Sequence, residues 1–130
     1  MDLIASFPAD VPLPQPHDVT AGGVRFRVLG MRLDRYNAER AVLEVGLRAA
    51  APKDSYGGIN FTSDCLRLVV DDVPRAPSTF LNELVAAGAT KDAKLEFLLT
   101  DVPKKVELVF RYGADDPVRV PFRIPGLGSP

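Results

Sequence analysis

The chain has 130 residues, of which 46% are hydrophobic, 25% charged and 8% aromatic. This is the composition of one ordinary globular domain, long enough to bury a core without metal or disulfide bonds. One cysteine excludes an internal disulfide framework, one histidine excludes most histidine-based metal sites, and a formal charge of −1 argues against a strongly basic nucleic-acid-binding protein.

The N-terminal segment is rich in proline. Pro8, Pro12, Pro14 and Pro16 fall within the first twenty residues. Because proline fixes φ and lacks an N–H donor, we expect residues 1–21 to form a flexible, extended spacer before a domain at 22–125. Residues 126–130 are expected to form a second flexible end.

Targeting signals are not predicted. The N-terminus lacks a basic cluster, its apolar run Leu3–Phe7 is too short for a signal-peptide core, and no stretch approaches the ~20 apolar residues of a membrane span. Two locations therefore remain open. The protein is either cytoplasmic or an exported protein whose signal has been removed.

Beyond the spacer, apolar and polar residues alternate with a period of two. In residues 24–33, for example, Val24, Phe26 and Val28 alternate with Arg25 and Arg27. Similar segments follow at 41–49, 65–71, 93–100, 105–112 and 117–124, with a seventh short strand at 59–61. This period predicts antiparallel strands with one buried and one solvated face.

The segments between the expected strands are rich in proline, glycine and aspartate, as turns are. Short strands separated by such turns favour a β-sandwich or barrel. Pro121 interrupts the last strand and should therefore lie at a sheet edge. One segment departs from the pattern, because Phe80, Leu81, Leu84 and Val85 are spaced as in a helix. We expect a short helical turn near residues 79–87, with Gly88 as its C-cap.

The second half of the chain resembles a known type of domain. An apolar "FLNELV" segment precedes Gly88, and Phe97 is central to the next strand. Val102–Pro103 then precedes the apolar strand "KKVELVFRY". This order is similar to the immunoglobulin-like β-sandwich domains of small bacterial secreted proteins and lipoproteins, a family mostly of unknown function. The resemblance implies an all-β sandwich of about seven strands in an exported module, and it implies no catalytic residues.

The sequence contains no recognisable catalytic, cofactor or metal motif. His17, the single histidine, lies in the expected spacer, which could not hold a general base in a fixed geometry. Cys65 heads a core-forming strand and is expected to be an inert thiol. The acidic pairs at 71–72 and 115–116 lie in expected turns, where aspartates mostly bond their own backbone rather than calcium. We therefore expect no cofactor and no metal.

One arrangement suggests a binding surface. Cationic side chains occupy the outward positions of three expected strands: Arg25, Arg27, Lys105, Arg111, Arg119 and Arg123. If the first strand and the last two share a sheet, as is common in immunoglobulin-like domains, these six cations would form one anion-binding face. Arg48 and Arg75 are expected to lie off that face. The alternative is that the cations only solvate the sheet and protect its edges.

These observations predict a non-catalytic binding or structural module outside the bacterial cytoplasm, with a protein or an anionic surface or polymer as partner. No specific nucleic-acid signal is present. Two alternatives remain, a cytoplasmic interaction or scaffold domain and a small enzyme with an unrecognised site. The second is disfavoured because the folded part offers no catalytic triad or ligand cluster.

Overall fold

The computed structural model describes residues 9–35, 40–100 and 105–124. These residues form eleven strands and one 3-10 turn, η2 (Ser63–Cys65). The strands are β1 (Ala9–Val11), β2 (Asp18–Ala21), β3 (Val24–Arg35), β4 (Ala41–Ala50), β5 (Ile59–Thr62), β6 (Leu66–Val70), β7 (Val73–Arg75), β8 (Asn82–Val85), β9 (Thr90–Leu99), β10 (Val106–Phe110) and β11 (Val118–Phe122).

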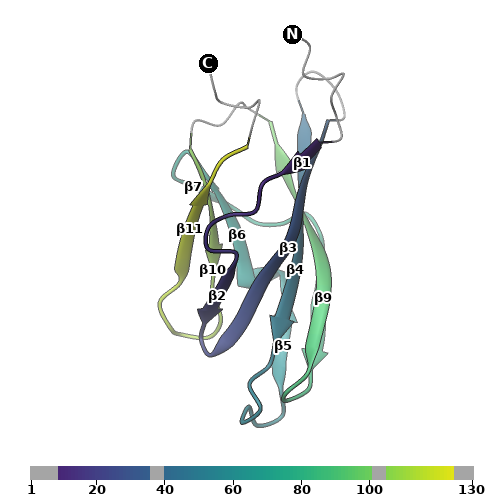
Figure 1. Cartoon of the computed structure of the whole chain (residues 1–130), viewed down its shortest axis with the longest axis vertical. Coiled ribbons are helices and arrows are strands. Elements are labelled where there is room, and N and C mark those ends of the chain that lie inside the picture. Colours follow the sequence, from purple (N-terminus) through teal and green to yellow (C-terminus); the bar gives the residue numbers. More distant parts are fainter. Residues whose placement is uncertain (1–8, 36–39, 101–104, 125–130) are drawn as a thin grey trace.

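All strand pairs are antiparallel and belong to three sheets (Figure 1). Sheet A has the order β1-β3-β4-β9, and β2 pairs with the same strand β3 as β1 does. Sheet C has the order β11-β10-β6-β7, and the small sheet B consists of β5 and β8. The expectation of an all-β antiparallel fold is confirmed.

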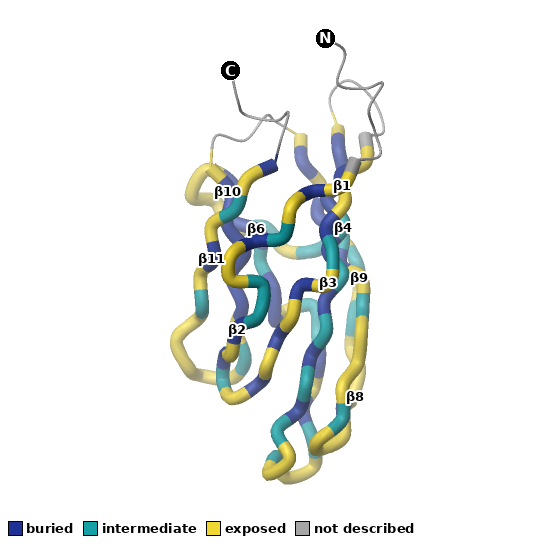
Figure 2. The backbone as a smooth tube through the Cα atoms, viewed as in Figure 1, coloured by how far each residue is buried: buried dark blue, intermediate teal, exposed yellow. Residues whose placement is uncertain are grey.

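One hydrophobic core joins the three sheets, and the buried residues alternate along most of the long strands (Figure 2). Phe26 of sheet A lies at its centre. Its ring centroid is 6.0 Å from that of Phe110 in sheet C and 6.4 Å from that of Phe61 in sheet B. All three rings are at most 1% exposed. Sheets A and C therefore turn their inner faces toward each other across this core, as the period-two pattern of their strands requires.

The expected helical turn at residues 79–87 is wrong, because β8 occupies Asn82–Val85. Leu81 and Val85 pack against the core, whereas Phe80 and Leu84 are 84% and 66% exposed. The apolar residues of this segment thus lie on both sides of an extended chain. Their apparent helical spacing does not correspond to one buried face.

The expected flexible spacer is wrong for the described part of residues 1–21. β1 and β2 pair with β3, and Val11, Val19 and Ala21 are buried. The prolines at 12, 14 and 16 fall between these two strands, where no ladder needs their missing N–H. The folded domain therefore includes residues from Ala9 onward. Residues 1–8 and 126–130, and the Val102–Pro103 mark, lie outside the described residues.

Particular residues limit strand pairing at two sheet edges, the β11 edge of sheet C and the β9 edge of sheet A. Pro121 lies in β11 at the edge of sheet C, which confirms the sequence expectation. At the β9 edge of sheet A, the Ser78 backbone N–H donates to the Glu96 carbonyl at 2.7 Å, and the Glu96 N–H donates to Thr79 Oγ1 at 2.9 Å. The segment between β7 and β8 thus covers the middle of this edge.

In the described part of the chain, no helix is long and apolar enough to cross a membrane.

Candidate functional site

The six cations predicted to share one face are divided between two sheets. Arg25 and Arg27 lie on β3 in sheet A, whereas Lys105, Arg111, Arg119 and Arg123 lie on or beside β10 and β11 in sheet C. The premise that the first long strand and the last two share a sheet is wrong, because β3 forms its ladder with β4 and β10 forms its ladders with β6 and β11. Since the inner faces meet at the core, the two outer faces point in opposite directions.

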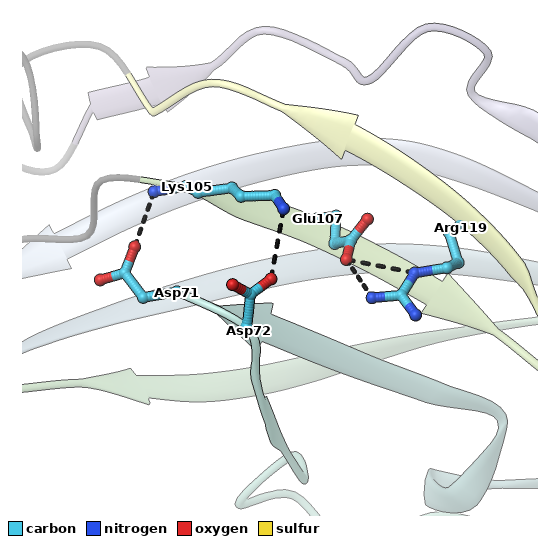
Figure 3. A network of polar contacts seen from close by, with 5 residues as sticks. All are labelled: Asp71, Asp72, Lys105, Glu107 and Arg119. Atoms are coloured by element: carbon cyan, nitrogen blue, oxygen red, sulfur yellow. Dashed lines mark hydrogen bonds and ion pairs between the residues drawn. The ribbon is translucent and has the colours of Figure 1, made fainter.

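On sheet C, carboxylates or carbonyls of the protein already bind Lys105, Arg111 and Arg119. Figure 3 shows the carboxylate contacts of Lys105 and Arg119. Arg119 donates to Glu107, the Lys105 ammonium lies 3.2 Å from Asp72, and the Lys105 backbone N–H donates to Asp71 at 2.8 Å. The Arg111 Nε donates to the backbone carbonyl of Asp64 at 2.9 Å. Arg123 is exposed just after β11. The matched ion pairs leave little local excess of positive charge at Lys105 and Arg119.

Sheet A instead gathers three arginines on its outer face. Arg27 and Arg48 are direct neighbours in the β3·β4 register, and Arg25 lies two residues from Arg27 on the same side of its strand. Together with Asp18, Ala50 and Thr90 they line a hollow of about 180 Å³. Arg48, expected off the binding face, is therefore part of the cluster. We call Arg25, Arg27 and Arg48 the arginine cluster.

Two aspartates hold the arginine cluster in place. The Asp18 carboxylate accepts a hydrogen bond from Arg27 Nη2 at 2.8 Å and lies 3.6 Å from Arg25 Nη2. Asp92 accepts two hydrogen bonds from Arg48, at 2.7 and 3.0 Å. These bonds hold the pKa values of the Asp18 and Asp92 carboxyls below their usual range, so both remain charged at neutral pH. Three cations and two carboxylates leave a local excess of one positive charge.

The cluster retains hydrogen-bonding capacity for a ligand. Each guanidinium carries five N–H donors, far more than the bonds to Asp18 and Asp92 use. The three side chains are 41–65% exposed, so a ligand can reach them from solvent. Their planar forks match the geometry of carboxylate, sulfate and phosphate groups.

A second, larger hollow adjoins the cluster on the same face. It measures about 590 Å³ and is shallow and open. Its floor includes Gly30 and Gly46, which are paired in register at a β-bulge of β3. Charged residues of both signs surround it: Asp10, Arg32, Glu44, Asp92 and Lys94. Gly46 and Arg48 are two residues apart on β4, so their Cα atoms lie about 7 Å apart along the strand and the two hollows are neighbours.

Cys65 and His17, the single cysteine and the single histidine of the chain, both lie outside the strands. Cys65 is buried in η2, and burial raises the pKa of its thiol to about 12, so it stays protonated at neutral pH. His17 lies in the connection between β1 and β2, where its carbonyl accepts a hydrogen bond from the Val28 N–H. Among the described residues, no three His, Cys, Asp or Glu side chains are placed to hold a metal ion.

The acidic pair at 71–72 has a structural role. Both aspartates have positive φ and form the turn between β6 and β7. They bind Lys105, the residue just before β10. The pair at 115–116 is exposed in the turn before β11.

Sequence reasoning missed Asp18, Arg48 and Asp92, because their proximity to Arg27 depends on strand register. It also missed Gly30 and Gly46, although glycines at outward positions of two successive strands were a usable signal. Glycine in a strand interior often marks a bulge or a close approach by another molecule.

Comparison with known proteins gives information about the fold alone. No family model and no curated protein matches the sequence. The structure is similar to one described as that of a "putative lipoprotein (ycdA)" from Bacillus subtilis, with a TM-score of 0.58 and 16% sequence identity. The match covers 83% of this chain and 38% of the B. subtilis chain, so the present chain spans well under half of that protein.

Proposed function

We propose that this chain is a non-catalytic binding module of the bacterial cell envelope, with an immunoglobulin-like sandwich fold, and that it recognises an anionic ligand through Arg25, Arg27 and Arg48. The observation that carries the proposal is the convergence of three exposed guanidinium groups over one hollow, with positive charge in excess.

The envelope location is supported by two independent features. The sequence resembles domains of secreted proteins and lipoproteins, and the fold is similar to that of a protein described as a putative lipoprotein. Cell fractionation of the native organism with an antibody against this chain tests the location. Recovery in the cytosol would contradict it.

A non-catalytic role agrees with the chemistry of the described residues. The Cys65 thiol is protonated and inaccessible, and a protonated thiol is a poor nucleophile. The carboxylates nearest the arginine cluster are engaged by the arginines, so neither is a free base.

Binding to inorganic polyphosphate, measured by fluorescence anisotropy, tests the arginine cluster. We expect weak binding that falls steeply as salt rises from 50 to 300 mM, because exposed charges are screened over about 8 Å at physiological ionic strength. The double variant Arg25→Gln/Arg48→Gln should weaken binding at least tenfold.

The matched control is Arg119→Gln/Arg123→Gln, which removes the same charge from the opposite face. It should change the affinity less than twofold. Equal losses in the two double variants would mean that the attraction follows overall charge, and they would refute the assignment of the site.

A further inference from the structure

We infer that the ligand is an acidic saccharide, whose carboxylate binds the arginine cluster while a sugar ring lies over Gly30 and Gly46. This inference rests on the proposed function, since it extends the ligand from the arginine cluster into the adjoining 590 Å³ hollow.

Neither the backbone φ of the two glycines nor the space around them requires the absence of a side chain. Neither has a φ in the left-handed region. A Cβ added to Gly30 meets no atom within 4 Å, and one added to Gly46 makes only ordinary contacts, 3.6 Å or longer, with Gly30 and Leu29. Glycine inside a strand costs about 0.5–1 kcal/mol relative to alanine. The pair therefore lowers stability, and what it provides is an open, flat floor in the middle of a sheet face.

The surroundings of this floor match the chemistry of a saccharide. Sugar hydroxyls both donate and accept hydrogen bonds, and the hollow offers acceptors at Asp10 and Glu44 and donors at Arg32 and Lys94. Lys94 and Glu44 form a loose ion pair with each other at 3.7 Å, and the Lys94 side chain is 74% exposed, so both keep hydrogen-bonding capacity for a ligand. The C–H face of a pyranose ring would rest on the glycine backbone and on Leu29, which is 41% exposed. A volume of about 590 Å³ lies within the range of small-molecule sites.

Two other ligand classes fit less well. An acyl chain would cover the apolar floor of the hollow, but it has no group that could bind the charged side chains around the floor or the arginine cluster beside it, and covering charged groups without a partner is costly. An extended peptide gains most from adding to a sheet edge. Here the floor is the face of a sheet, where Gly46 is already paired to strands on both sides.

The arrangement also fits an acidic rather than a neutral sugar. The arginine cluster lies about 7 Å from Gly46 along β4, within reach of a carboxylate on the same or the next ring. The carboxylates of Asp10, Glu44 and Asp92 disfavour an anion directly over the floor, which fixes the orientation of the ligand.

The experiment measures binding of the whole chain to three probes by isothermal titration calorimetry: an oligogalacturonate, its carboxyl-reduced neutral counterpart, and inorganic polyphosphate. We expect the oligogalacturonate to bind at least tenfold more tightly than the reduced form. Gly46→Leu, which fills the floor, should weaken oligogalacturonate binding at least tenfold and leave polyphosphate binding within twofold. Ala114→Leu, in the exposed turn before β11, is the control and should change neither affinity.

The outcomes separate the two proposals. The saccharide inference is wrong, while the anion site remains, in either of two cases. In the first, polyphosphate binds but oligogalacturonate binds no more tightly than its carboxyl-reduced form. In the second, Gly46→Leu leaves the affinity for oligogalacturonate unchanged. If neither anion binds, both proposals fail. Should Gly46→Leu not fold, Gly30→Leu fills the same hollow at a position where an added Cβ meets nothing, and the same criteria apply.

Discussion

Gly57 and Gly58, which precede β5, offer a matched test of how closely β5 and β8 approach each other. Both have left-handed φ values, +76° and +81°. An alanine Cβ at Gly57 would meet nothing within 4 Å, whereas at Gly58 it would lie 2.3 Å from the Val85 carbonyl oxygen. Real Cβ atoms essentially never come closer than 3.0 Å to such an atom, so the two backbones would have to separate by at least about 0.7 Å.

The expected costs follow from this difference. A left-handed conformation costs a non-glycine residue about 1–2 kcal/mol, which is the whole expected effect of Gly57→Ala. Gly58→Ala has the same cost and also separates the buried pair Ile59 and Val85. The conformational cost is at least about 1 kcal/mol. One disturbed ladder hydrogen bond and the lost packing add about 1 kcal/mol each, so the total destabilisation is at least ~3 kcal/mol.

Thermal unfolding followed by circular dichroism distinguishes these values. An unfolding entropy of about 2.1 cal/mol/K per residue over this chain means that 1 kcal/mol lowers Tm by about 4 °C. We expect a decrease of about 4–7 °C for Gly57→Ala and more than ~11 °C for Gly58→Ala. If the two variants melt within 2 °C of each other, the close approach of Gly58 to Val85 is not a determinant of stability, and the reasoning is refuted.

Three further predictions concern the core, one ion pair and the thiol. Phe97→Ala and Phe110→Ala should each cost about 3–5 kcal/mol in chemical denaturation, because both side chains are fully buried; losses below 1 kcal/mol would contradict the strand registers. The hydrogen bond from Arg119 lowers the pKa of Glu107 in the folded state. The stabilisation from this ion pair is therefore fully present above the unfolded-state pKa of Glu107 and is lost as the pH falls through its folded-state pKa. The difference in unfolding free energy between wild type and Glu107→Gln should therefore shrink from pH 6 to pH 3, and a constant difference would refute the linkage. Cys65 should react with iodoacetamide at pH 8 far more slowly in native protein than in denaturant, as followed by mass spectrometry, since burial raises its pKa to about 12; equal rates would show that the thiol is accessible.

The sequence was sufficient to predict the long strands and the edge position of Pro121, because alternation and proline act locally. It was misleading where apolar residues are exposed. Phe80 and Leu84 completed an apparent helical stripe, yet both face solvent beside β8. The prolines near the N-terminus were also misleading, because they suggested that the whole segment around them is unpaired. They exclude pairing at their own positions but say nothing about the residues on either side, and β1 and β2 flank them.

The candidate site was not predictable from local patterns. Alternation shows that β3 and β10 are strands but not which strands they pair with. That choice depends on contacts between residues far apart in the sequence, and here β3 pairs with β4 while β10 pairs with β6 and β11. The proximity of Arg48 to Arg27 depends further on the register shift at the bulge between Val28 and Gly30. A change of one residue in register moves a side chain to the other face, so a correct list of strands does not determine which arginines meet.

The contacts of Ser78 and Thr79 with Glu96 have a consequence for solubility. β9 is a ten-residue strand at a sheet margin, and an unprotected strand of that length is a template on which other molecules can polymerise. The covering segment occupies the N–H and carbonyl of Glu96 near the middle of that margin, so an incoming strand cannot form a continuous intermolecular ladder along it. The short connection between β7 and β8 therefore protects the β9 edge against strand addition by other molecules.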